Sequence, residues 1–275
     1  MTEKIYDFIL ILKAEFKRDL IFMRRYPLEI ISFLFFMYLI LMSIILGFSQ
    51  LMTEGSIVEG NSPLNREKMI IGYCLMQFML STQMGWSGQI QNESQTGTLE
   101  QLSISGHSLG DVLLARGLSQ LPRQCLSFFL LLFTYSITLS NAQITFQNSL
   151  QGIFVLTVIA FGIYGISFAF AGLTLLFKRV GFFFQIINFG FLGLFWQNRA
   201  SLEDGSLIAN LYDYFPLTHG MKFLLKYFQN NPNSIPFTGN LFLLIITSLL
   251  STLIGIFLFY LMEKRARNLG LLSQY

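Results

Sequence analysis

The stretch "ESQTGTLEQL", residues 93–102, interrupts a chain that is otherwise strongly apolar. One apolar run precedes it, at residues 69–89, and a shorter one follows, at residues 124–139. About 20 helical residues are needed to cross the roughly 30 Å of hydrocarbon in a bilayer. We therefore expect two membrane spans here, with the polar stretch at the membrane surface between them.

The composition extends this interpretation to the whole chain. Of its 275 residues, 53% are hydrophobic and only 12% are charged, against about 25% charged residues in soluble domains. The sequence predicts an all-α polytopic membrane protein in which residues 28–275 form a single six-helix transmembrane domain. The six spans are expected at 28–48, 69–89, 124–139, 150–177, 180–197 and 241–262. A net charge of only +3 gives no indication of a nucleic-acid partner, and the apolar composition makes membrane lipids the expected surroundings.

The distribution of Lys and Arg sets the expected orientation. With these six spans, 13 of the basic residues fall on the side of the termini and five on the opposite side. Basic residues are enriched on the cytoplasmic side of membrane proteins. We expect a multi-pass protein of the cell (inner) membrane with both termini in the cytoplasm. The first long apolar run begins only after Pro27, so no cleaved signal peptide is expected.

Residues 1–27 form an expected interfacial helix. Apolar side chains recur there every three or four residues, at Ile5, Phe8, Leu12, Phe16, Leu20 and Met23. This spacing predicts an amphipathic helix on the inner leaflet, and a simple membrane anchor would have the same pattern. The "RRYP" of residues 24–27 predicts a turn, because the residue before a proline is disfavoured in the helical region.

The polar stretch itself predicts a short helix along the membrane surface. Gly97 permits a sharp exit from the second span, and Glu100 suits the positive end of the following helix dipole. The carboxylates of Glu93 and Glu100 are expected to face the cytoplasm, where they favour a protein partner. On the opposite side, the apolar spacing after Pro216 predicts one or two short external helices before the last span.

The run "ESQTGTLEQLSISGHSLGDVLLARGL", residues 93–118, resembles the loop of ABC-2 type exporter membrane subunits that contains "GTLE". "FPLTHGMKFL", residues 215–224, is similar to the start of that family's external helix. The resemblance implies a coupling helix that docks into a cytoplasmic ATPase subunit. The residues it implies for coupling are Glu93, Gly97, Thr98, Leu99, Glu100 and Leu102. The chain departs from the family at His107, where a proline is frequent.

The energy source is expected on a partner chain. The sequence has no GxxxxGK[ST] loop to cradle phosphates. The chain itself is therefore expected to be a transport subunit without enzymatic activity, cofactor or metal. The resemblance implies two ATPase subunits that bind ATP and Mg²⁺. It also implies a second permease half, which is either an identical copy or a paralogue.

Polar and aromatic stripes within the spans are candidates for a substrate pathway. The resemblance implies that the second and fifth spans line the central path of a dimer. The expected pathway residues are Gln77, Ser81, Phe184, Asn188, Phe191 and Phe195. Two other roles compete, since Phe-rich helices also face lipid and buried amides also join helices. Small residues in the fourth span indicate close helix packing instead, at Gly162, Gly165, Ala169 and Gly172.

The sequence therefore predicts the permease subunit of an ATP-driven exporter for an amphipathic substrate: a drug, a peptide, a lipid or a lipid-linked glycan. One alternative is a membrane enzyme that uses Asp213 and His219 on a lipid-linked substrate at the outer face. Another is a non-transporting receptor or immunity component of the same design. The two cysteines, Cys74 and Cys125, lack CxxC spacing and are interpreted as packing residues.

Overall fold

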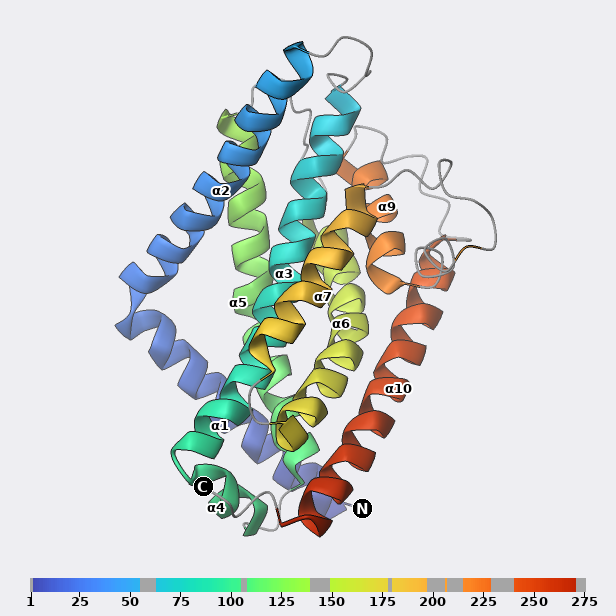
Figure 1. Ribbon diagram of the computed structural model, residues 1–275. Coiled ribbons are helices and arrows are strands. Elements are labelled where there is room, and N and C mark those ends of the chain that lie inside the picture. Colours follow the sequence, from blue (N-terminus) through green and yellow to red (C-terminus); the bar gives the residue numbers. More distant parts are fainter. Residues whose placement is uncertain are drawn as a thin grey trace.

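In a computed structural model, the described residues are 2–54, 63–104, 108–138, 149–177, 180–196, 206, 215–228 and 240–270. These residues form nine α-helices and no strand (Figure 1). The helices are α1 (Thr2–Arg25), α2 (Pro27–Glu54), α3 (Pro63–Gln95), α4 (Thr98–Ile104), α5 (Leu109–Thr138), α6 (Ser149–Phe177), α7 (Gly181–Trp196), α9 (Pro216–Phe228) and α10 (Asn240–Asn268).

The described helices have the length and composition of a membrane protein. Within α6 and α10, Gly152–Phe177 and Leu241–Asn268 are each long and apolar enough to cross a bilayer. The bent pair of α1 and α2 would make a third span if it crosses as one unit. This confirms an all-helical, membrane-type architecture. The count of six spans stays a prediction, because α3 and α5 carry many polar side chains and α7 has only 16 residues.

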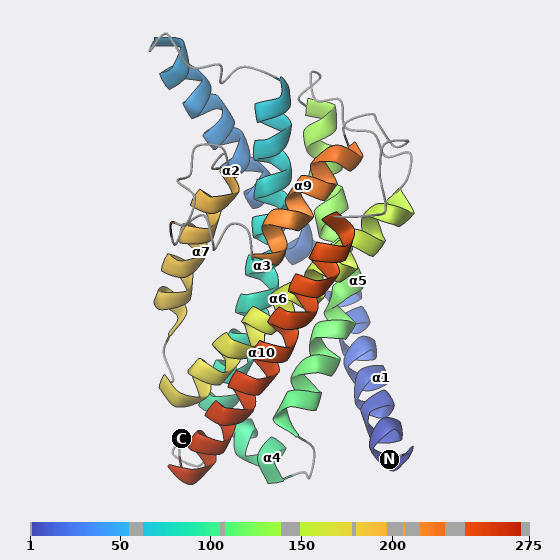
Figure 2. The ribbon, with the colours of Figure 1, turned by 90° about the vertical axis from the view of Figure 1, so that its right-hand side faces the viewer.

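The turn predicted at residues 24–27 is present. Helix α1 ends at Arg25, and α2 begins at Pro27 with a change of direction of 80°. Proline lacks an amide proton and suits the first position of a helix, where that proton has no acceptor. Helix α1 then lies along the end of α5 that is nearer to α4 (Figure 2).

Helix α3 lies at the centre of the described helices and packs against α5, α6, α7 and α9. Its Trp86 stacks on Tyr164 of α6, with ring centroids 5.1 Å apart. The hydroxyl of Tyr164 donates a hydrogen bond to the carbonyl of Gly117 in α5, at 2.7 Å. One buried aromatic cluster therefore joins three helices.

The closest packing is between α6 and α10. Gly165 and Gly255 face each other so tightly that a Cβ atom at either position would overlap the opposite backbone. The hydroxyls of Ser251 and Thr252 donate across this seam to the carbonyls of Gly162 and Phe161, at 2.8 and 2.7 Å. The packing role predicted for the small residues of the fourth span is thus confirmed at Gly162 and Gly165.

The two ends of the molecule differ. Helix α4 and both termini lie at one end, and α9 lies toward the other (Figure 1). Helix α9 begins at Pro216, as predicted, and buries Leu217, Met221 and Leu224. It packs against α6, α10 and α3. Helix α9 therefore packs across three helices toward the end of the bundle opposite α4.

Candidate functional site

A buried arginine connects three helices near α4. The Nε atom of Arg116 in α5 lies 2.9 Å from Glu15 Oε1 in α1, and its Nη2 atom lies 2.5 Å from Glu93 Oε1 in α3. Only 7% of the Arg116 side chain is exposed. Burial alone would lower the pKa of this guanidinium, but the hydrogen bonds and charges of Glu93 and Glu15 outweigh it and raise the pKa above its usual value.

A second ion pair joins α1 to α5. Arg123 Nε lies 3.2 and 3.3 Å from the two carboxylate oxygens of Asp19. Glu15 and Asp19 are four residues apart, and Arg116 and Arg123 are seven apart, so each pair shares one helix face. From the sequence, both arginines contributed only to the count of basic residues that sets the orientation. The signal that could have revealed the contact was that the two acids share one face of their helix and the two arginines share one face of theirs.

Glu93 does not have the orientation expected from the sequence. Its carboxylate was expected to face the cytoplasm, yet it lies against Arg116 and only 19% of the side chain is exposed. The physical reason is the buried guanidinium, which requires a counter-ion. Glu93 is thus half-buried and pairs with α5 of the same chain. The side chain of Glu100 lies outside the described side chains.

The short helix predicted after Gly97 is α4. Gly97 has a φ of 72°, which only glycine adopts at little cost, and the chain turns there from α3 into α4. Thr98, the first residue of α4, is exposed, and its hydroxyl donates to the carbonyl of Glu93 at 3.3 Å. Leu99 is buried and Leu102 half-buried. Both border the gap beside Phe259 of α10, so they anchor α4 to the body of the protein.

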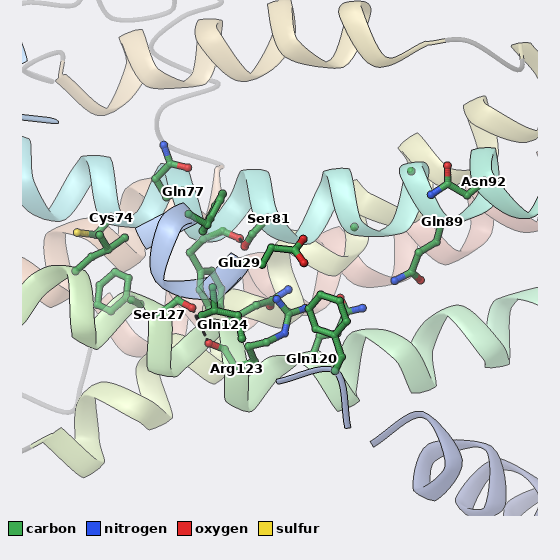
Figure 3. Close-up of a pocket in the computed structure, with 18 residues that line it drawn as sticks. Glu29, Cys74, Gln77, Ser81, Gln89, Asn92, Gln120, Arg123, Gln124 and Ser127 are labelled. Atoms are coloured by element: carbon green, nitrogen blue, oxygen red, sulfur yellow. Dashed lines mark hydrogen bonds between the residues drawn. The ribbon is translucent and has the colours of Figure 1, made fainter. Parts of the chain in front are cut away.

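A cavity of about 490 Å³ lies between α2, α3 and α5, with Phe22 of α1 at one edge (Figure 3). Its lining combines apolar walls with several polar side chains. The amide and hydroxyl side chains that line it are Gln77, Ser81, Gln89, Asn92, Gln120, Gln124 and Ser127. Gln77, Gln120 and Gln124 are all more than nine-tenths buried. The carbonyl oxygen of the Gln124 amide accepts a hydrogen bond from Thr82 at 3.1 Å, which fixes its orientation.

Gln77 and Ser81, two of the expected pathway residues, therefore line a cavity. Sequence reasoning missed its α5 wall, although Gln120, Gln124 and Ser127 recur at the three- and four-residue spacing of one helix face. The signal was obscured because the predicted third span began only at residue 124. In the structure, α5 begins fifteen residues earlier, at Leu109.

The structure does not bring the expected α7 residues to this cavity. Phe184 stacks on Phe170 of α6 with centroids 4.1 Å apart, and Phe191 stacks on Phe215 at 4.4 Å. Asn188 is 1% exposed, and neither of its amide atoms has a hydrogen-bond partner within the described part of the chain. The rings of Phe184 and Phe191 thus pack against other aromatic rings of the same chain. The side chain of Phe195 lies outside the described side chains.

Of the two histidines and Asp213, the structure describes only His219. His107 and Asp213 lie outside the described residues, and His219 is half-buried in α9. Among the described residues, no group of three or more His, Cys, Asp or Glu could hold a metal ion. Cys74 and Cys125 are buried free thiols, in agreement with a packing role. Comparison of the chain with protein-family models, curated proteins and solved structures finds no match.

Proposed function

We propose that this chain is the membrane-spanning subunit of an ATP-driven exporter, with α4 as the element that contacts a cytoplasmic ATPase. In this proposal the chain has six spans, α1 lies on the inner membrane surface, and both termini are cytoplasmic. Two such halves, identical or paralogous, would work with two ATPase subunits. Because the chain has no phosphate-binding loop, the ATPase subunits would bind ATP and Mg²⁺.

The observation that carries the proposal is the link from α4 to the buried ion pairs. Leu99 and Leu102 fix α4 to the body, and Glu93 lies one turn before the Gly97 bend. Glu93 in turn pairs with Arg116, which also holds Glu15 of α1. A displacement of α4 would therefore act on α1, α3 and α5 together, since breaking a buried ion pair is costly.

The cavity lies between helices whose spacing such a displacement would change. Helix α2 is held at Met37, whose carbonyl accepts hydrogen bonds from Tyr73 and Tyr135 at 3.1 and 3.2 Å. At its other end α2 continues through Tyr26 into α1, which is tied to α5 by Asp19 and Arg123. Movement of α1 would change the distance between α2 and the α3–α5 wall. ATP binding would drive this change, and hydrolysis would reset it.

Co-purification tests the proposal. The full chain is extracted in mild detergent with each ATPase subunit encoded near it, in native form and with Glu100→Arg combined with Gln101→Arg. Gln101 is exposed on α4, so the variant should fold normally. We expect one ATPase to bind the native chain and to be lost from the variant.

Lys264→Glu is the matched control, because Lys264 is exposed in the last part of α10 at the same end of the molecule. It should retain the ATPase. A native chain that binds no ATPase, or an α4 variant that binds as well as the control, would contradict the proposal. Dependence of activity on His219 instead of α4 would favour chemistry at the outer face.

A further inference from the structure

We infer that the cavity between α2, α3 and α5 binds the uncharged, hydroxyl-rich headgroup of a lipid, that is, a neutral glycolipid. The binding claim stands on the cavity itself. Only the interpretation of this lipid as cargo rests on the proposed function. Three features of the lining carry the inference: its amides, its charge and its apolar walls.

The amides match a ligand with many hydroxyls. Each glutamine presents two N–H donors and one carbonyl acceptor, and a sugar hydroxyl both donates and accepts. Gln77, Gln120 and Gln124 line the cavity while being more than nine-tenths buried. The carbonyl oxygen of Gln89 is buried and has no hydrogen-bond partner within the described residues. A ligand hydroxyl that donates to it would satisfy an otherwise costly buried acceptor.

The charges disfavour an anionic ligand. Glu29 and Arg123 are the charged residues among those that line the cavity. The Arg123 guanidinium is already paired with Asp19, and Figure 3 shows the Glu29 side chain among the residues that line the cavity. The charged lining residues and the Asp19 counter-ion together therefore carry one positive and two negative charges. This balance disfavours a phosphate, and a cationic headgroup would compete with Arg123 for Asp19.

The walls match a lipid more closely than a free sugar. Phe22, Phe33, Phe78 and Phe128 border the cavity, and Phe33 of α2 is 43% exposed. Acyl chains could therefore extend along apolar surface while the headgroup occupies the polar interior. The volume of about 490 Å³ falls within the roughly 300–1,000 Å³ typical of small-molecule sites.

Gly88 provides a way to fill the cavity without disturbing the fold. It lines the cavity, and a Cβ atom placed on it meets nothing within 4 Å. Gly88→Leu should therefore project into the open space. Gly190→Leu is the matched control, since Gly190 in α7 is equally free of neighbours and is not part of the lining.

The test uses the full chain in phosphatidylcholine nanodiscs that contain equal amounts of three dioleoyl lipids: monoglucosyl diacylglycerol, phosphatidylglycerol and a trimethylammonium-propane lipid. The protein is released from the nanodiscs with a detergent whose headgroup is not a sugar. Native mass spectrometry then measures which of the three lipids stays bound. We expect the glucosyl lipid to be retained about five- to tenfold over the others, as befits one or two net hydrogen bonds. Gly88→Leu should abolish this preference and Gly190→Leu should keep it.

The amides are tested separately. Gln124→Leu combined with Gln120→Leu should reduce retention of the glucosyl lipid about five- to tenfold. Gln83→Leu should not, because Gln83 is equally buried but is not part of the lining. If the paired variant fails to fold, the Gly88→Leu comparison decides alone.

Three results would overturn the inference: stronger retention of either charged lipid, equal retention by Gly88→Leu and Gly190→Leu, or displacement of the glucosyl lipid by free methyl glucoside. The last result would assign the site to a soluble sugar. If the glucosyl lipid binds but no ATPase co-purifies, the exporter proposal fails and the site stands. If an ATPase co-purifies without lipid preference, only the site inference fails.

Discussion

Arg116 and Glu93 form the tightest ion pair of the described structure that spans two helices, with Nη2 and Oε1 2.5 Å apart. The same guanidinium also lies 2.9 Å from Glu15. One positive charge therefore pairs with two carboxylates from different helices, of which Glu15 also pairs with Arg18. Removing one partner from a buried ion pair is strongly destabilising, because the remaining charge stays buried without a counter-ion.

Arg116→Met is therefore expected to destabilise the chain by about 3–5 kcal/mol. Thermal or denaturant unfolding in detergent measures this change. Arg18→Met is the control, since Arg18 pairs with the same Glu15 but is 56% exposed, and exposed pairs contribute about 0–1 kcal/mol. Equal losses for the two variants would mean that the Arg116 network contributes little.

The seam between α6 and α10 should not tolerate a methyl group. A Cβ atom on Gly165 would overlap the backbone of Ser251, which cannot move aside as a side chain could. Gly165→Ala is expected to destabilise by about 1–3 kcal/mol through overpacking. Gly190→Ala, which meets no neighbour, should be neutral or slightly stabilising in the same unfolding assay. If Gly165→Ala leaves the free energy of unfolding unchanged, these helices do not pack in backbone contact.

Substitution of Gly97 is expected to destabilise the chain because of the backbone conformation of this residue. Its φ of 72° is disfavoured for residues with a Cβ atom, so Gly97→Ala should cost about 1–2 kcal/mol. Gly97→Asn should cost less, because asparagine adopts this conformation more readily. Gly88→Ala should have the opposite effect. It should raise the free energy of unfolding by about 0.5–1 kcal/mol, because Gly88 is an unhindered glycine in a helix interior. Identical effects at 97 and 88 would argue against the left-handed turn.

Tyr164→Phe should remove one buried hydrogen bond without leaving a cavity. The hydroxyl donates to the Gly117 carbonyl at 2.7 Å, and its loss is expected to cost about 1 kcal/mol. Because Trp86 stacks on Tyr164, the Trp86 fluorescence of the folded state should change little if the ring stays in place. Tyr6→Phe is the control, since Tyr6 is 64% exposed. A larger loss accompanied by a fluorescence shift would mean that the hydroxyl positions the ring.

The elements of the fold were largely predictable because their signals are local. The turn before Pro27, the bend at Gly97 and the start of α9 at Pro216 each follow from the backbone preferences of one residue. The small-residue packing of Gly162 and Gly165 was likewise visible, because the spacing marks one helix face.

The site was less predictable because it depends on contacts between distant segments. Glu93 pairs with Arg116, which pairs with Glu15, about a hundred residues earlier in the chain. A single sequence does not show which charges meet. The contacts of the α7 stripe were not predictable for the same reason, since stacking of Phe184 on Phe170 can be seen only once the helices are placed.

The seam of Gly165 and Gly255 also has a consequence for how the protein is made. The contacting residues Gly162 and Ser251 are 89 positions apart, so α6 enters the membrane long before its partner has been synthesised. Until α10 arrives, the small-residue groove of α6 has only lipid tails to cover it. A chain truncated before residue 240 would expose this groove permanently. Helix α10 thus covers the groove of α6, and a chain without α10 would present to membrane quality-control proteases a groove that is closed when α10 is in place.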